Sequence, residues 1–575
     1  MKLSIICLLT IAAFSTAATI SYTYHPGKVQ TAEIDVYKQK QFILQCSPLY
    51  IPSEDESIPP LEGWGNYSWK ISTSSDSAQF YFDQGLNMYY AFHIIESRAS
   101  FDKATHFDSA CAMAWWGKAL AFGPNINDFG YEPPSEALPS ATKANSLKNN
   151  GTNIEKALIE AMAVRYSADS ASDQNKLNVL YKDEMNKVYE TYGGNADVTA
   201  LYADALMLLH PWDLYNHDYS PKQWTPEIIT VLKNAFKINI NHPAANHYYI
   251  HVVEASARPQ EALRSAEFLS NAMPNVSHIT HMPSHIYIRT GYYNKGIEMN
   301  DKAVRGFKKY SQSFAPVANG AFLYSLHNLH MKMSCAQMAG NYQLSMETAK
   351  QLQENIPVFY LSAPGAIGNS VQYIYQSPLF TQLRFGKWEE ILEEQVVDSL
   401  SFTPVLQHFA RGLAFAKTMR AIEAEKELEL MKIKMNNPSL KTPIIPFNAA
   451  YDVAIVAENI LEGVIAAQKK DYPDAITFLQ KAVQAEDNLV YNEPRDWILP
   501  ARQYLGDVLL KAGKYNEALA VFEADLAINP NNGWDLTGIK EVFEKQHKTT
   551  SLAKLNPRLK NAWLIKDVPI NGAVF

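Results

Sequence analysis

The segment RQYLGDVLLKAGKYNEALAVFEADLAINP, residues 502–530, decides the fold expected for this chain. Its small residues Gly506 and Ala518 stand twelve positions apart. Phe522 follows four positions after the second of them, and Pro530 ends the segment. Small residues allow two helices to approach closely, and a large apolar residue fills the seam between them. The spacing therefore predicts an antiparallel pair of helices.

The same spacing recurs along much of the chain. It is present in FDQGLNMYYAFHIIESRASFDKATHFD (82–108), ARGLAFAKTMRAIEAEKEL (410–428) and EGVIAAQKKDYPDAITFLQKAVQ (462–484). Repeated helix pairs of about 34 residues are typical of tetratricopeptide repeats, which stack into solenoids. A chain of 575 residues is also long for one ordinary compact domain. We therefore expect an all-α tetratricopeptide-repeat (TPR) solenoid, a superhelix of antiparallel helix pairs.

The N-terminus carries a short apolar run from Leu3 to Ala13, followed by small residues up to Ala18. This pattern is typical of a secretory signal peptide, and the run is too short to span a bilayer. We expect residues 1–18 to be removed and the protein to be exported, either to the periplasm or out of the cell. After this removal no membrane-spanning segment is expected.

Composition divides the remaining chain into three parts. Residues 19–75 are rich in proline, serine and acidic residues, which favours an extended N-terminal arm. Residues 76–545 are expected to form the solenoid, with a long insertion around residues 210–226 between the two helices of one repeat. Residues 546–575 are expected to be a C-terminal tail.

Six motifs resemble a family of bacterial TPR proteins, exported and largely of unassigned function. They are AQFYFDQGLNMYYAFHIIESRASF, CAMAWWGKALAFGPNIN, HPAANHYYIHVVEAS, HMPSHIYIRTGYY, LHNLH and EPRDWILPARQYLGDVLLKAG. The resemblance covers roughly residues 62–540 and implies a right-handed superhelix of paired helices, but no particular reaction or ligand. Members of this family often carry histidines before the first repeat, where this chain has GWGNYSW (63–69).

Histidines are concentrated in residues 242–330, which hold eight of the fifteen in the chain. Two H-x-x-x-H pairs stand in this stretch: His247 with His251, and His281 with His285. An i, i+4 spacing places two side chains on the same face of a helix. The second pair follows the first after 34 residues, which is the period of the repeat. The two pairs are therefore expected at equivalent places on successive repeats.

The repeat register directs these histidines into one concave groove, with His330 on the next repeat. Packed helices lie about 8–10 Å apart, so imidazoles on neighbouring helices can reach a shared metal ion. Glu254 continues the face of the first pair, and His327 lies nearby. The candidate metal ligands are His247, His251, Glu254, His281, His285, His327 and His330. Imidazole and carboxylate ligands suit zinc, copper or iron.

Other histidines are expected to support the fold rather than to bind a ligand. His242 and His278 stand at helix entrances, where a cap or a group that orients the ligands is expected. His93 and Glu96 fall at a turn between two helices, where a structural role is expected.

Two function classes remain open. In the first, the protein is an exported scaffold or binding protein with a histidine-rich metal site in its groove, or with a polar groove that holds a protein or peptide without metal. In the second, the same histidines hold a metal ion for a hydrolase or oxidoreductase, with no catalytic residue assigned. The formal net charge of −8 and the lack of a basic block argue against nucleic acid as a partner.

Overall fold

The computed structural model describes residues 57–128, 131–169, 172–317 and 322–575. The expected signal peptide and most of the expected N-terminal arm lie outside the described residues. Within the described ranges the regular structure is helical and includes no strand, only an isolated bridge between Tyr215 and Pro221. The all-α prediction is therefore confirmed.

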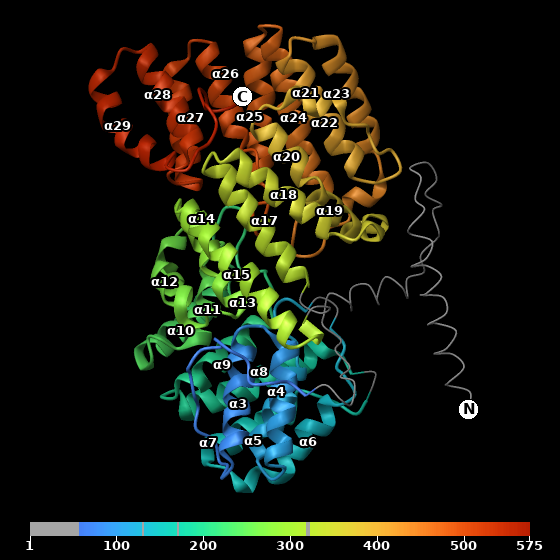
Figure 1. The fold of residues 1–575 in the computed structure, drawn as a ribbon, viewed down its shortest axis with the longest axis vertical. Helices are drawn as coiled ribbons and strands as arrows, with labels where there is room; N and C mark the ends of the chain where they lie inside the picture. Colours follow the sequence, from blue (N-terminus) through green and yellow to red (C-terminus); the bar gives the residue numbers. More distant parts are fainter. Residues whose placement is uncertain (1–56, 129–130, 170–171, 318–321) are drawn as a thin grey trace. The chain divides into compact units, whose positions relative to one another are not determined.

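The N-terminal helices pack as consecutive pairs, drawn in blue to green in Figure 1. They are α3 (Asp76–Tyr90), α4 (Ile94–Phe107), α5 (Ala112–Phe122), α6 (Ala137–Leu147), η2 (Lys148–Asn150), α7 (Asn153–Met162), α8 (Gln174–Tyr192), α9 (Ala196–Met207) and α10 (Thr225–Ile238). Helix α3 packs against α4, α5 against α6, and α9 against α10. The first helix of the described residues begins at Asp76, where the sequence places the start of the solenoid.

The middle helices hold the histidine-rich stretch. They are α11 (Pro243–Val253), η3 (Pro259–Ala262), α12 (Leu263–Ala272), α13 (Ser277–His281), α14 (Pro283–Thr290), α15 (Tyr293–Ser313), α17 (Phe322–Met338) and α18 (Tyr342–Asn355). Helix α11 contacts both α3 and α14, and α17 contacts both α13 and α14. The first helices of three successive repeats thus lie side by side, which is the arrangement that the repeat period predicts.

The C-terminal helices continue the pairing. They are η4 (Val358–Ser362), α19 (Gly365–Tyr375), α20 (Ser377–Arg384), α21 (Trp388–Glu393), α22 (Thr403–Lys417), α23 (Ala421–Met435), η5 (Pro438–Lys441), α24 (Ala450–Gln468), α25 (Tyr472–Asp487), α26 (Ala501–Lys511), α27 (Tyr515–Ile528), α28 (Gly533–Lys545) and α29 (Thr549–Ala562). Residues 546–575, expected to be a tail, thus contain helix α29. Just after this helix, Trp563 packs on Trp534 with ring centroids 5.4 Å apart.

The small residues of the repeat allow paired helices to approach closely. A Cβ atom added at Gly506 of α26 would lie only 2.3 Å from the ring of Phe522 in α27. A Cβ atom added at Gly85 of α3 would lie 2.9 Å from the ring of Phe101 in α4. Both distances are shorter than a carbon–carbon contact allows, so a larger residue at either position would push the helices apart. Packing of this kind forms the seam that the spacing of the repeat predicts.

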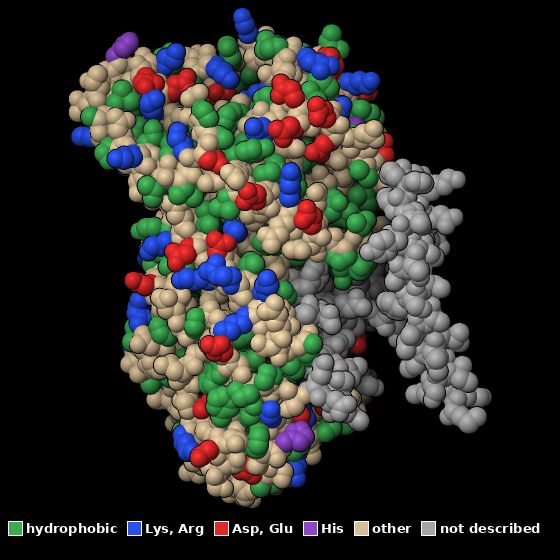
Figure 2. Space-filling view, in the orientation of Figure 1, with side chains coloured by type: hydrophobic (Ala, Val, Ile, Leu, Met, Phe, Trp, Pro, Cys, Tyr) green, Lys and Arg blue, Asp and Glu red, His purple; other side chains and the backbone are tan. Residues whose placement is uncertain are grey.

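The surface drawn in Figure 2 mixes acidic and basic side chains and shows few histidines. The histidines of the middle repeats are instead mostly buried. Among the helices in the described ranges, none is both long and apolar enough to cross a membrane.

Candidate metal centre

The first histidine pair lies on α11. His247 Nε2 and His251 Nε2 are 3.0 Å apart, as the i, i+4 spacing predicts. His247 Nδ1 lies 2.6 Å from the backbone oxygen of Tyr90, at the end of α3. A carbonyl oxygen only accepts hydrogen bonds, so His247 Nδ1 carries a proton and donates it. In the neutral ring, Nε2 therefore directs its lone pair at His251.

The second pair extends over α13 and α14. Pro283 has no backbone N–H and divides the two helices, but Met282 between them keeps helical dihedral angles of φ −49° and ψ −38°. The i, i+4 relation is therefore preserved. His281 Nε2 and His285 Nε2 lie 2.6 Å apart.

Asn300 of α15 fixes the ring of His281. The Nδ2 atom of Asn300 donates to the backbone oxygen of Gly296 at 2.8 Å, which sets the orientation of the amide. Its Oδ1 atom consequently faces His281 Nδ1 at 2.6 Å and accepts the proton from it. Like His247, neutral His281 then directs the lone pair of Nε2 at the other member of its pair.

Glu254 connects the two pairs and follows directly after α11. Its Oε2 atom lies 2.7 Å from His285 Nδ1, and its Oε1 atom lies 3.2 Å from His251 Nδ1. The hydroxyl of Tyr491 donates to Oε2 at 3.3 Å. The carboxyl is 1% exposed. It contacts the Nδ1 atoms of both imidazoles, on the opposite side of each ring from the Nε2 atom that faces the other member of its pair.

Glu493 is a second carboxyl beside Glu254, and it was not singled out as a candidate ligand from the sequence. It lies in the segment between α25 and α26. Its Oε1 atom is 3.2 Å from His285 Nδ1, and its Oε2 atom is 3.6 Å from His327 Nε2. No spacing in the sequence links Glu493 to the histidines. The one signal is that it opens the motif EPRDWILPARQYLGDVLLKAG used for the family resemblance.

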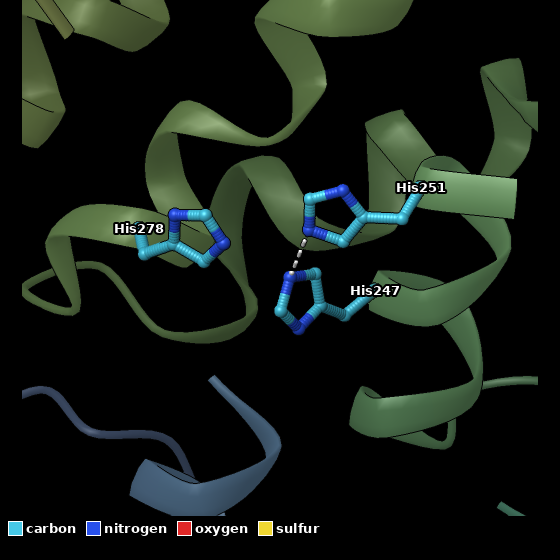
Figure 3. Close-up of side chains that lie close together, drawn as sticks. All are labelled: His247, His251 and His278. Atoms are coloured by element: carbon cyan, nitrogen blue, oxygen red, sulfur yellow. Dashed lines mark hydrogen bonds between the residues drawn. The ribbon is translucent and has the colours of Figure 1, made fainter. Parts of the chain in front are cut away.

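His278 of α13 joins the first pair, although the sequence favoured a cap or an orienting role for it. Figure 3 shows its ring facing His247 and His251. The ring centroids of His278 and these two residues are 5.0 Å and 5.7 Å apart. Both ring nitrogens of His278 are buried and have no hydrogen-bond partner. Buried polar atoms are normally satisfied, so these nitrogens point to a ligand for the His278 ring.

His327 of α17 joins the second pair. Its ring centroid lies 4.6 Å from that of His281 and 5.4 Å from that of His285. Three groups of side chains could each hold a metal ion, because the potential ligand atoms within each group lie within 4.8 Å of one another. The first triad is His247, His251 and His278, the second triad is His281, His285 and His327, and the third group is His251, Glu254 and Glu493.

The remaining histidines have other places. His330 is buried on α17 but belongs to none of these groups, and it lines a cavity of about 130 Å³ whose wall also includes Glu493. His242 caps α11, where its Nδ1 accepts from the backbone N–H of Ala245 at 3.2 Å. His93 lies 2.7 Å from Glu96 through Nδ1, and its Nε2 accepts from the backbone N–H of His278.

Burial keeps five of the six triad imidazoles uncharged near neutral pH. It lowers the pKa of His247 to about 3 and the pKa of His327 to about 4. It also lowers the pKa of His251, His278 and His281 well below the usual range of histidine. A neutral imidazole is the form that binds a metal ion.

His285 differs from the other five. Burial lowers its pKa, but the carboxyls of Glu254 and Glu493 outweigh burial and raise the pKa to about 10. Burial and the neighbouring carboxyl raise the pKa of Glu254 well above its usual range. Burial raises the pKa of Glu493, but the charge and hydrogen bond of His285, together with Glu254 and His327, outweigh burial and lower it. Without a metal ion the two carboxyls therefore share one proton, and His285 is protonated.

One cavity gives access to both triads. It has a volume of about 340 Å³, within the range of small-molecule sites. His251, His278, His327 and Glu493 form part of its polar wall. Its apolar wall is formed by Phe92, Ile94, Ile95, Trp212, Leu323, Tyr324 and Phe447.

The insertion between α9 and α10 contributes an aromatic side chain to this cavity. Trp212 meets the ring of His251 edge-on, with centroids 5.3 Å apart. The histidines of the insertion lie elsewhere: His210 stacks on Trp224 at 3.7 Å, and His217 contacts the backbone oxygen of Asp487.

Comparison with known proteins identifies the repeat. A family model for the tetratricopeptide repeat matches residues 500–532, and no curated protein matches the chain. The human IFIT1 dimer with m7Gppp-AAAA is 14% identical and has a TM-score of 0.29, with 94% of this chain and 97% of that chain covered. The APC/C hetero-tetramer Cut9–Hcn1 is 13% identical and has a TM-score of 0.27, with 84% of this chain and 76% of that chain covered. TM-scores this low do not indicate a shared arrangement of repeats, so the fold rests on the observed helix pairs and on the repeat match.

Proposed function

We propose that this TPR protein binds transition metal ions through two triads of buried imidazoles. Three imidazoles with a further position open to solvent or substrate are a ligand set that zinc and other first-row metals accept. The first triad would hold one ion through His247, His251 and His278. The second triad would hold another through His281, His285 and His327. Glu254 and Glu493 would orient the ligands from their outer nitrogens, as carboxylates commonly do for metal-binding histidines.

The orientation of the paired imidazoles carries this proposal. His247 and His281 each donate Nδ1–H to a fixed oxygen acceptor, so their Nε2 lone pairs face a second imidazole at short distance. Two facing nitrogens attract each other only with a proton or a metal ion between them. Polar groups that served only the fold would need no such convergence, and His278 would have no reason to keep both nitrogens unpaired.

The stacked helix pairs support a scaffold or protein-binding role for the chain as a whole. Solenoids of this kind present extended concave surfaces to their partners. Export belongs to the same proposal, because residues 1–18 have the pattern of a secretory signal peptide. An exported bacterial protein that holds metal ions inside a repeat scaffold is the function that the sequence and the triads together support best.

A metal-dependent enzyme, either a hydrolase or an oxidoreductase, is the second candidate. The cavity of about 340 Å³ beside His251, His278 and His327 favours it. A metal ion there would lower the pKa of bound water or bind oxygen, and the cavity would admit a small substrate with apolar character. A scaffold that only stores metal would not need this space.

Metal content tests the proposal. Protein purified without a tag is treated with a chelator, dialysed against zinc or copper at neutral pH, and measured by mass spectrometry of the elements. We expect two ions per chain for the wild type. His106→Ala and His547→Ala, which lie outside the triads, should retain both ions. Wild-type protein that binds no more metal than a His247→Ala/His281→Ala double variant would rule the proposal out.

A further inference from the structure

Two arginines outside the metal centre share the faces of two tyrosines. Arg289 lies on α14, and Arg495 lies between α25 and α26. The guanidinium carbon of Arg289 is 5.4 Å from the ring centre of Tyr219 and 5.0 Å from that of Tyr491. The corresponding distances for Arg495 are 5.7 Å and 5.8 Å. Both charges therefore lie beside the same two rings.

No carboxylate pairs with either arginine in the described part of the chain. The ion pairs recorded there involve other residues. Arg289 donates from Nε to the backbone oxygen of Glu254 at 3.1 Å and from Nη2 to that of Ser256 at 2.8 Å. Arg289 is only 8% exposed, and its Nη1 atom is buried without a hydrogen-bond partner. The Nη2 atom of Arg495 is also buried without a hydrogen-bond partner.

No ion pair with a carboxylate compensates these two positive charges in the described ranges. Burial lowers the pKa of Arg495, but Tyr219, Tyr491 and other neighbours together outweigh burial and raise it. Burial lowers the pKa of Arg289, and the charge of Arg495 lowers it further. The carboxyl of Glu486 lies within electrostatic reach of Arg495, but it accepts the backbone N–H of Ala501 at 2.7 Å. Burial raises the pKa of Glu486 to about 8, so it is mostly uncharged at pH 7. One buried guanidinium and one half-buried guanidinium without an ion-pair partner are costly unless a ligand supplies the counter-charge.

A cavity adjoins the two arginines. Its volume is about 490 Å³, and Arg289 and Arg495 both line it. Tyr219, Gln260, Thr290 and Tyr292 line it as well. This cavity shares no lining residue with the cavity beside the histidine triads. The unpaired guanidinium nitrogens therefore adjoin a space in which a small molecule fits.

We propose that Arg289 and Arg495 form a binding site for an oxyanion, the phosphate or carboxylate group of a small molecule held in this cavity. Guanidinium groups bind both kinds of oxyanion through paired N–H···O hydrogen bonds. The tyrosine rings hold the guanidinium planes in place before the ligand arrives. The site does not depend on metal in the triads, so it stands or fails separately from the proposed function.

Calorimetric titration of the full chain at pH 7 tests this site, with inorganic phosphate in one arm and malonate in the other. We expect one of the two probes to bind with a 1:1 stoichiometry. Arg495→Gln should weaken that binding at least tenfold, because it removes one of the two guanidinium groups that line the cavity. Arg258→Gln removes an equal charge from an exposed arginine paired with Glu261, so it should leave the affinity unchanged.

The two arms distinguish the source of the oxyanion. Binding of phosphate alone identifies a phosphate ester as the ligand class, and binding of malonate alone identifies a carboxylate. Arg495→Lys keeps the charge but loses the planar fork, so it should weaken binding by a smaller factor and provides a second variant if Arg495→Gln fails to fold. If neither probe binds the wild type, or if Arg495→Gln and Arg495→Lys both bind as tightly as the wild type, the proposal is overturned.

Discussion

The two imidazole triads each contain a pair with the same i, i+4 spacing, 34 residues apart along the chain, but the triads differ in electrostatic surroundings. In the first triad the fixed outer partner of His247 is the backbone oxygen of Tyr90, which carries no charge. In the second triad His285 faces the carboxyls of both Glu254 and Glu493. Burial therefore keeps His247 neutral, whereas the carboxyls keep His285 protonated. The comparison teaches that repeat spacing sets where ligand nitrogens lie, while contacts from other repeats set their charge.

Removal of one ligand from each triad should have the largest effect. His247→Ala should abolish binding at the first triad and leave one ion at the second. His281→Ala should do the reverse. Loss of one of three imidazoles is expected to weaken binding by more than about a hundredfold, since loss of an outer-sphere partner alone costs about 10–100-fold. Metal stoichiometry checks this, and circular dichroism should show that each variant keeps the helix content of the wild type. Loss of both ions in either variant would show that the triads form one site.

Removal of the shared carboxylate should affect both triads at once. Glu254→Gln keeps the shape of the side chain, but it replaces one acceptor oxygen with a donor amide, which cannot accept Nδ1–H from both His251 and His285. Affinity at each triad should fall about 10–100-fold. Competition with a chromophoric chelator measures this. Glu261→Gln, in an exposed acid of the same region, serves as the control, and unchanged affinity in Glu254→Gln would contradict the orienting role.

The pH dependence of stability should differ between the triads in the metal-free protein. The folded-state pKa of His285 is raised from 6.5 to about 10. The contribution of His285 to the free energy of unfolding is thus fully present below pH 6.5, and it is lost as the pH rises through 10. The folded-state pKa of His247 is lowered to about 3, so its contribution is instead lost as the pH falls below 6.5. Each slope approaches about 1.4 kcal/mol per pH unit.

Urea unfolding in the presence of a chelator measures both slopes. His285→Asn, which retains a donor toward Glu254, should remove the alkaline slope and leave the acid slope in place. An alkaline slope of unchanged size in His285→Asn would assign this proton to another group.

The smallest effect is expected for His330. It was a candidate ligand on the basis of repeat register, but it belongs to neither triad. His330→Ala should leave the metal stoichiometry at two and change affinity by less than about twofold. A metal titration of this variant checks the expectation. His327→Ala is titrated beside it for comparison, since it removes a ligand of the second triad from the same helix. Loss of an ion in His330→Ala would place His330 in the centre.

The sequence by itself determined the helix pairs and the pairing of the histidines. Small residues twelve positions apart specify the seam, which the contact of Gly506 with Phe522 shows. The i, i+4 spacing fixes two side chains on one helix face, so both Nε2 pairs lie at 2.6–3.0 Å even where Pro283 divides the helix. These features are local, and local geometry depends mainly on residue type and spacing.

Only the tertiary structure decided which further groups complete the two triads. Glu493 comes from a distant repeat, His278 turns its ring toward α11, and His330 belongs to neither triad although its register matched. Glu254 contacts the outer nitrogens of two imidazoles, a position that spacing alone does not distinguish from that of a direct ligand. The physical reason is that helical periodicity fixes a direction around one helix. The approach of other helices and segments depends on how all the repeats stack.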